Sequence, residues 1–261
     1  ENCGSKLTKA QQLGVRIITE EEFMEEDFYD DFIDESILEQ AVKKLPSITL
    51  LWHYRSKNEN LIAFSNKHVY DSHLITFPCV RKSQENFGVE FEYVEGIYQK
   101  KKKLANKIEA DRVVELIEKH INEFGTSRSL GVIAFGERQR YTIERAIIEF
   151  RKQHIKESIY EKFFSADLKE PFFIKNIENV QGDERDTIIF SVGYGKDENG
   201  TFKYNFGPLQ QIGGERRLNV AISRAKHNLK VVASFLPEEI DLSRVESEGV
   251  RLFKEYLQFA Y

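Results

Sequence analysis

The chain has 261 residues, which allows one large domain or two small ones. Apolar residues make up 41% and charged residues 31%, a composition that excludes collagen, coiled coil and low-complexity disorder. The formal net charge is −5, so a nucleic-acid site would have to be a local basic patch on an acidic protein. Two cysteines exclude a disulfide framework, and no apolar run approaches the roughly 20 residues that span a bilayer. We expect a cytoplasmic protein without a membrane contact.

The first part of the chain differs in character from the rest. Thr19 and Glu22 have the spacing of a capping box, which predicts a helix start. The segment that follows, from 25 to 39, is strongly acidic and is typical of a solvated linker that leads into a helix. We therefore separate residues 1–26 from a large domain at 27–261.

Short apolar runs alternate with helical segments from residue 48 onward. Most runs are continuous, as expected for strands that are covered on both faces. The run at 89–94 alternates with glutamates, which predicts an edge strand. Helices are expected from Ser56 to about Tyr70, over 108–121 with a stop at Gly125, over 137–154 and over 249–259. The predicted strands are 48–52, 89–94, 130–135, 172–177, 187–192 and 229–235.

This alternation predicts an α/β fold with a mostly parallel sheet and helices on both faces. The Asn199-Gly200 pair predicts a hairpin turn that interrupts the pattern. The sequence contains no G-x-x-x-x-G-K-[ST] phosphate loop, and its six histidines lack the spacing of metal ligands. We expect no metal site.

The segment 216–226, RRLNVAISRAK, predicts an amphipathic helix. Leu218, Ile222 and Ala225 would form its apolar stripe, and Arg217 and Arg224, seven positions apart, would lie on nearly the same outer face. Guanidinium groups suit phosphate oxygens because they offer a rigid fork of donors and stay charged. A solvated basic face with surface ion pairs is the structural alternative.

Two further polar segments lie beside predicted strands. The segment 178–186, ENVQGDERD, separates two buried strands, so we expect it at the rim of the sheet where open α/β sheets bind ligands. Arg55 follows the predicted strand at 48–52 and precedes a helix start, which is a favourable location for an anion. Trp52 is expected in the core. An ordinary polar turn and a salt bridge from Arg55 to the acidic linker are the alternatives.

Taken in order, these three segments resemble motifs IV, V and VI of the second RecA-like domain of superfamily 1 helicases. The resemblance covers residues 31 to about 261 and is greatest to large bacterial helicases of the Upf1-like branch. It implies a RecA-like fold of the P-loop NTPase type that lacks its own phosphate loop. It also implies ATP with Mg²⁺ as cofactor, bound mainly by the first RecA-like domain of the same protein, and a nucleic acid, expected to be DNA, as partner.

The resemblance also implies roles for individual residues. Arg224 matches the arginine finger of motif VI and Arg55 the motif IV arginine that contacts the triphosphate. The resemblance further implies that Arg217 and the motif V residues Gln181, Gly182 and Glu184 contact the nucleotide. It implies that Gln139 and Arg138 contact the nucleic-acid backbone. Many relatives have Thr-Pro where this chain has Ala134-Phe135. Arg140 and Arg145 are further candidates for phosphate contacts.

The segment from Gly4 to Phe23 resembles the closing part of a BRCT domain, most like that of bacterial NAD-dependent DNA ligases. In such domains the residue that matches Lys6 can bind a phosphate. Two functions other than a DNA helicase motor remain compatible with the sequence. One is a non-catalytic scaffold in DNA repair; the other is an RNA helicase domain, because motifs IV to VI do not distinguish the two nucleic acids. We expect this chain alone not to hydrolyse ATP.

Overall fold

The computed structural model describes residues 12–13, 37–79, 85–99, 105–154 and 157–261. Contacts divide the chain into two compact units, 1–50 and 51–261. In the first unit the main described element is helix α4, Ile37–Lys44. The BRCT-like segment with Lys6, the capping box at Thr19 and the acidic stretch before Ser36 lie outside the described residues.

The second unit contains a five-stranded sheet in which every neighbouring pair is parallel. The order is β1-β5-β4-β2-β3, so the chain crosses over between neighbouring strands of the sheet. The strands are β1 (Gly88–Tyr93), β2 (Leu130–Ala134), β3 (Phe173–Asn176), β4 (Arg185–Ser191) and β5 (Ala225–Ala233). The predicted α/β class with a parallel sheet is confirmed, and β1 is the edge strand that its alternating pattern predicted.

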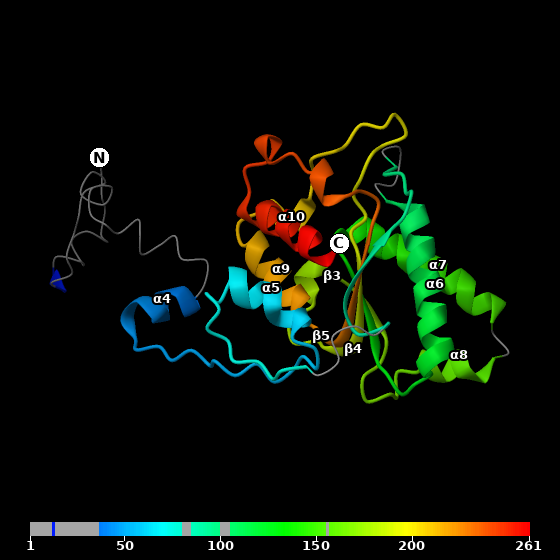
Figure 1. Cartoon of the computed structure of the whole chain (residues 1–261), viewed down its shortest axis with the longest axis horizontal. Coiled ribbons are helices and arrows are strands. Elements are labelled where there is room, and N and C mark those ends of the chain that lie inside the picture. Colours follow the sequence, from blue (N-terminus) through cyan, green and yellow to red (C-terminus); the bar gives the residue numbers. More distant parts are fainter. Residues whose placement is uncertain (1–11, 14–36, 80–84, 100–104, 155–156) are drawn as a thin grey trace. The chain divides into compact units, whose positions relative to one another are not determined.

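Helices cover both faces of the sheet, as Figure 1 shows. One face carries α6 (Lys107–Phe124), α7 (Glu137–Gln153) and α8 (Ser158–Phe163). The other carries α5 (Asn60–His68), α9 (Gly214–Ile222) and α10 (Glu248–Ala260). Short 3₁₀ turns lie at Ile177–Asn179, Gly207–Leu209, Pro237–Glu239 and Leu242–Arg244.

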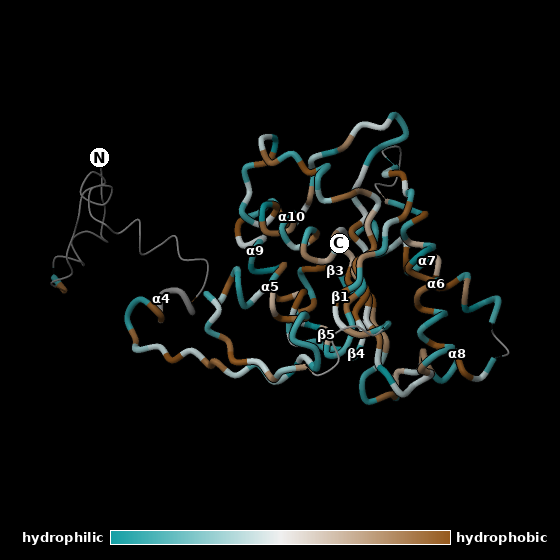
Figure 2. The backbone as a smooth tube through the Cα atoms, in the orientation of Figure 1, coloured by the Kyte–Doolittle hydropathy of each residue, from teal (hydrophilic) through white to brown (hydrophobic). Residues whose placement is uncertain are grey.

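Each face of the sheet has its own hydrophobic core, because successive strand residues point to opposite sides. Val132 and Ile189 pack with α6 and α7, whereas Ile133, Phe190 and Val231 pack with α9 and α10. Figure 2 shows the apolar residues concentrated along the central strands. The continuous apolar runs of β2 and β4 are therefore explained by burial on both sides.

Local signals placed most of the helices correctly. Asn106 caps α6 by accepting from the N–H of Glu109 at 3.1 Å, and Gly125 ends it with a φ of 55°. A positive φ at this position favours glycine, because glycine has no Cβ atom to clash with the backbone. The expected tight turn at Asn199-Gly200 is present, with a φ of 73° at Gly200 and a bridge between Lys196 and Phe202.

Two expectations near motif IV were wrong. Residues 48–52 do not form a strand of this sheet; Trp52 makes only an isolated bridge to Ile75 and is 61% exposed, so it is not a core residue. Ser56 does not cap a helix either, since α5 begins at Asn60. Asn58 accepts from the N–H of Asn60 at 2.9 Å instead. None of the helices in the described ranges combines the length and apolarity that crossing a membrane requires.

Candidate functional site

Arg55 and Glu184 form an ion pair that joins the motif IV segment to the motif V turn. The Arg55 Nε atom donates to Glu184 Oε2 at 2.6 Å, and Arg55 Nη1 donates to the backbone carbonyl of Ser223 at 3.3 Å. The side chains are 24% and 40% exposed, so both are reachable from solvent. The segments that resemble motifs IV, V and VI therefore meet in the folded chain.

Arg224 reaches the same place from the turn that follows α9. Its Nε donates to the carbonyl of Val220 at 2.7 Å, Nη2 donates to Ser223 Oγ at 2.8 Å, and Nη1 donates to the carbonyl of Asp183 at 3.3 Å. These bonds hold the half-buried guanidinium group beside the motif V turn. Burial, together with the nearby positive charge of Arg55, lowers the pKa of Arg224.

The site lies at the amino ends of two strands. Arg224 immediately precedes β5, and the turn at Gln181–Glu184 immediately precedes β4. Open α/β sheets bind ligands at the carboxyl ends of their strands, and we expected this turn there. That expectation was wrong, because the turn lies at the amino ends of the strands. The eight-residue connection from β3 returns the chain to the opposite edge before β4 begins. Gln181 and Gly182 are exposed there, and Gly182 has a φ of 89°.

The expected helix at 216–226 is shorter than predicted, because α9 ends at Ile222 and β5 begins at Ala225. Arg224 therefore does not share a helix face with Arg217. The Arg217 Nη1 atom donates to the carbonyls of Ile212 at 2.8 Å and Pro208 at 3.3 Å, which places its guanidinium group against the preceding loop. The structure brings together Arg55, Arg224 and the motif V turn, and it leaves Arg217 outside this group.

Two guanidinium groups held close together attract a polyanion, since each repels the other until a negative charge lies between them. The Glu184 carboxylate partly neutralises the positive charge of these two arginines. Two tyrosines that the sequence analysis overlooked lie nearby. Tyr54 is 75% exposed beside Arg55, and the Tyr70 hydroxyl accepts from Asn219 Nδ2 at 3.1 Å close to Arg224. An exposed aromatic ring next to an anion site suits a nucleobase.

Of the two adjacent residues that were predicted to contact the nucleic-acid backbone, Gln139 is buried and Arg138 is exposed. Gln139 is only 2% exposed, and its amide bonds to Asn106 N at 2.8 Å, Asn106 O at 3.0 Å and Ser191 Oγ at 3.1 Å. Its side chain therefore joins α6, α7 and β4 inside the protein rather than facing a ligand. Arg138 is exposed on the first turn of α7. Arg140 pairs with Glu137 and Glu144.

A buried acid at the carboxyl ends of β4 and β5 was also overlooked. Glu109 has no exposed surface and accepts from the Ser191 hydroxyl at 2.8 Å, the Gly193 N–H at 2.6 Å and the Ser234 hydroxyl at 3.2 Å. Burial raises the pKa of Glu109 to about 8, although these hydrogen bonds act in the opposite direction. The helical pattern of the sequence gave no signal for this, because an acid in the first turn of a helix is ordinary.

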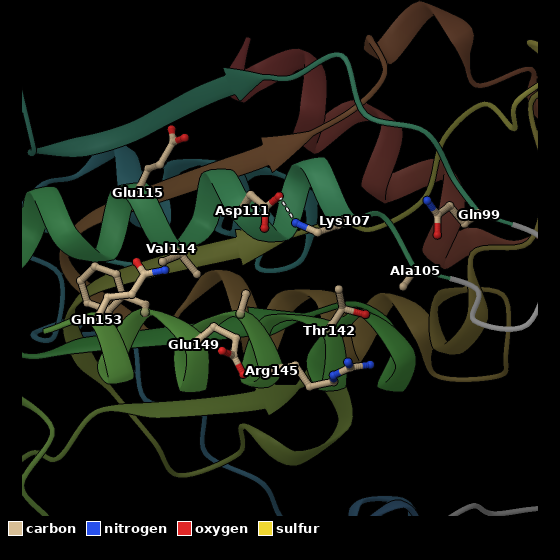
Figure 3. A pocket seen from close by; sticks show the side chains of 12 residues that line it. Gln99, Ala105, Lys107, Asp111, Val114, Glu115, Thr142, Arg145, Glu149 and Gln153 are labelled. Atoms are coloured by element: carbon tan, nitrogen blue, oxygen red, sulfur yellow. Dashed lines mark hydrogen bonds and ion pairs between the residues drawn. The ribbon is translucent and has the colours of Figure 1, made fainter. Parts of the chain in front are cut away.

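A pocket of about 540 Å³ lies between α6 and α7, as Figure 3 shows. Lys107 and Asp111 form an ion pair of 2.5 Å on one wall, and Arg145 and Glu149 lie on the other. The lining mixes both charges and includes neither Arg55 nor Arg224. Within the described ranges, no three His, Cys, Asp or Glu side chains are arranged to hold a metal ion.

The fold is a RecA-like α/β domain with a parallel sheet, and its sequence contains no phosphate loop. A family model described as an AAA domain matches residues 33–235. The chain therefore belongs to the AAA domain family.

Two curated relatives are similar over most of this chain. One, from Mycoplasma genitalium, is named "Uncharacterized ATP-dependent helicase MG140" and is 36% identical over 242 residues, which is 90% of this chain and 21% of the relative. Its homolog from Mycoplasma pneumoniae is 36% identical over 213 residues, 81% of this chain and 18% of the relative. The chain thus spans about a fifth of the length of these relatives.

A solved structure also resembles the chain. It is the carboxyl-terminal domain of a "possible DNA helicase" from Lactobacillus plantarum, with 15% identity and a TM-score of 0.38. The likeness covers 69% of this chain and 87% of that structure.

Proposed function

We propose that this chain is the carboxyl-terminal motor domain of an ATP-dependent DNA helicase or translocase. The observation that carries the proposal is the convergence of Arg55 and Arg224 beside the motif V turn. Two relatives named ATP-dependent helicases, each 36% identical to this chain, support it. The resemblance of motifs IV to VI to superfamily 1 of the Upf1-like branch supports the same class.

In this proposal ATP and Mg²⁺ are bound mainly by the first RecA-like domain of the same longer protein. That domain supplies the phosphate loop and the metal ligands, neither of which occurs among the described residues of this chain. Arg55 and Arg224 point their guanidinium donors at the terminal phosphate. Positive charge placed there stabilises the charge that develops on the phosphoryl oxygens, an effect worth about 10³ to 10⁵ in kcat for arginine fingers.

The motif V turn connects the nucleotide to the nucleic acid in this proposal. Glu184 holds Arg55 while no phosphate is present and releases it when a triphosphate arrives, because the phosphate offers a stronger negative charge. Arg138, exposed on α7, contributes to binding of the DNA backbone. Tyr54 stacks on the base of the nucleotide.

Arg224→Ala in the full-length protein tests the proposal. We expect kcat for DNA-stimulated ATP hydrolysis to fall by about 10³ or more while the affinity for single-stranded DNA changes less than twofold. Arg224→Lys is the matched control; it keeps the charge but loses the donor fork, so we expect a smaller loss. An Arg224→Ala protein with unchanged turnover refutes the proposal, and turnover stimulated by RNA alone assigns the domain to an RNA helicase.

A further inference from the structure

Arg185, the first residue of β4, is a buried arginine beside the motif V turn, and it is only 8% exposed. Its side chain bonds to backbone carbonyls. Nε and Nη2 donate to the Pro171 carbonyl at 2.9 and 2.6 Å, and Nη1 donates to the Glu184 carbonyl at 2.6 Å. The Cζ atom also lies 4.7 Å from the centre of the Phe173 ring. All three guanidinium nitrogens are therefore engaged by the chain itself.

The surroundings of Arg185 are unfavourable for a charge. Burial is the largest influence on this group and lowers its pKa, although four nearby acids act in the opposite direction. Each of these acids pairs with another cation: Asp183 with Lys175, Glu184 with Arg55, and both Glu170 and Asp186 with Lys226. Hydrogen bonds to neutral carbonyls offset only part of the cost of desolvating a charge. A buried arginine at this position therefore indicates a task beyond stability.

The Arg185 side chain spans part of the amino edge of the sheet. Pro171 lies two residues before β3, and β2 separates β3 from β4 in the sheet. The guanidinium group therefore reaches past the start of β2 and joins the segment before β3 to the motif V turn. Lysine offers one nitrogen atom in place of three, so it would not reproduce this bridge.

Both arginines of the site are bonded to Arg185 or to the turn that it holds. The Glu184 carboxylate accepts from Arg55 Nε at 2.6 Å, and the Asp183 carbonyl accepts from Arg224 Nη1 at 3.3 Å. The backbone N–H of Arg185 also donates to the Arg224 carbonyl at 3.1 Å. A displacement of the Arg185 side chain would therefore move the groups that hold both guanidinium groups.

We propose that Arg185 is a positioning residue that fixes the motif V turn so that Arg55 and Arg224 converge on one phosphate, an inference that rests on the proposed function. Arg185 does not contact the nucleotide in this role, because its own donors are engaged by the chain. It holds the turn, and the turn holds the two arginines. Such support from a neighbouring buried group is what keeps catalytic side chains in a productive geometry.

Steady-state ATP hydrolysis by the full-length protein tests the inference. Arg185→Met keeps an unbranched side chain and removes its donors. We expect kcat with single-stranded DNA to fall by about 10-fold to 100-fold, because small displacements of catalytic groups cost this much. The KM for ATP should change less than about threefold, because the phosphate-loop domain binds most of the nucleotide. Arg185→Lys should show a smaller loss of kcat, and thermal unfolding establishes that each variant is folded at the assay temperature.

Arg128→Met is the matched control. Arg128 also bonds to a backbone carbonyl, that of Asn86 at 3.4 Å, and lies over an aromatic ring, that of Phe124 at 4.2 Å. Neither contact involves the motif V turn, so kcat should stay within about twofold of the unsubstituted protein.

A double-mutant cycle with Arg224 distinguishes positioning from a general loss of structure. If Arg185 acts through the turn, Arg185→Met should reduce kcat less than about threefold in a protein that already carries Arg224→Ala. Losses that multiply in full overturn the inference. If Arg185→Met does not fold, Arg185→Lys carries the same cycle. Unchanged kcat in Arg185→Met with a large loss in Arg224→Ala refutes only the role of Arg185, whereas unchanged kcat in Arg224→Ala refutes the proposed function.

Discussion

Arg55 and Glu184 are 129 positions apart in the sequence, and their side chains form an ion pair of 2.6 Å. The contact links a segment that precedes the first helix of the sheet unit to a turn that precedes a central strand. Because both side chains are partly exposed, solvent screens the attraction and limits its contribution to stability. The contact also fixes the position of the Arg55 guanidinium group beside the turn that contains Glu184.

A double-mutant cycle on this pair should separate positioning from stability. We expect Arg55→Ala and Glu184→Ala to lower the free energy of unfolding by about 0.5–1 kcal/mol each, with strong non-additivity in the double variant. In the full-length protein we expect Arg55→Ala to reduce kcat far more than Glu184→Ala does, because in the proposed function only the arginine contacts the phosphate. Chemical denaturation and steady-state ATP hydrolysis measure the two effects. Equal losses of kcat would contradict the positioning role of Glu184.

The isolated chain should not hydrolyse ATP. Its sequence has no phosphate loop, which in the proposed function belongs to another domain and holds the β- and γ-phosphates. Phosphate release from the purified chain, with and without single-stranded DNA, measures this directly. Turnover stimulated by DNA in the chain alone would show that the division of labour between the two domains is wrong.

Glu109 should make the stability of the sheet unit depend on pH. Its folded pKa of about 8 is above the ordinary value of 4.5, so the folded state binds a proton more tightly than the unfolded state. The stabilising contribution is complete below about pH 4.5 and is lost as the pH rises through 8, at up to about 1.4 kcal/mol per pH unit. Chemical denaturation between pH 5 and 8 measures the slope.

Glu109→Gln should remove the contribution of about one bound proton to the slope of the unfolding free energy against pH, whatever its effect on absolute stability. Glu149→Gln, on the exposed side of α7, is the control and should leave the slope unchanged. Histidines with lowered pKa values, such as His120, act in the opposite direction because their stabilising effect is lost as the pH falls. An unchanged slope in Glu109→Gln would show that Glu109 is not the titrating group.

Gln139 and Arg138 are adjacent in sequence, but substitution of Gln139 should lower stability, whereas substitution of Arg138 should weaken DNA binding. Gln139→Ala leaves the N–H of Asn106 without a partner inside the protein, whereas the Asn106 carbonyl keeps the bond that it accepts from Ala110 N at 3.1 Å, so we expect a loss of about 1–3 kcal/mol of stability. Arg138→Ala should leave stability within about 0.5 kcal/mol of wild type and weaken binding of single-stranded DNA by the full-length protein. Thermal unfolding and fluorescence anisotropy measure the two effects. A Gln139→Ala protein of unchanged stability would contradict the buried role.

The sequence alone predicted the α/β class, most of the strands and helices and the three segments that meet at the site. It could do so because these features depend on local patterns: continuous apolar runs for buried strands, period 3.6 for helices, and helix stops such as Gly125. The edge position of β1 followed from its alternation with glutamates.

Tertiary structure decided the rest. Helical spacing continues through Ala225, yet α9 ends at Ile222 because Ala225 already pairs with Arg185 in the sheet. Gln139 and Glu109 look like surface residues in sequence, and only the packing of α6 and α7 on the sheet shows that they are buried. The run at 48–52 has the pattern of a strand without a strand partner in this sheet. Hydrogen-bond partners that are distant in sequence leave no local signal, and for this reason only the fold revealed them.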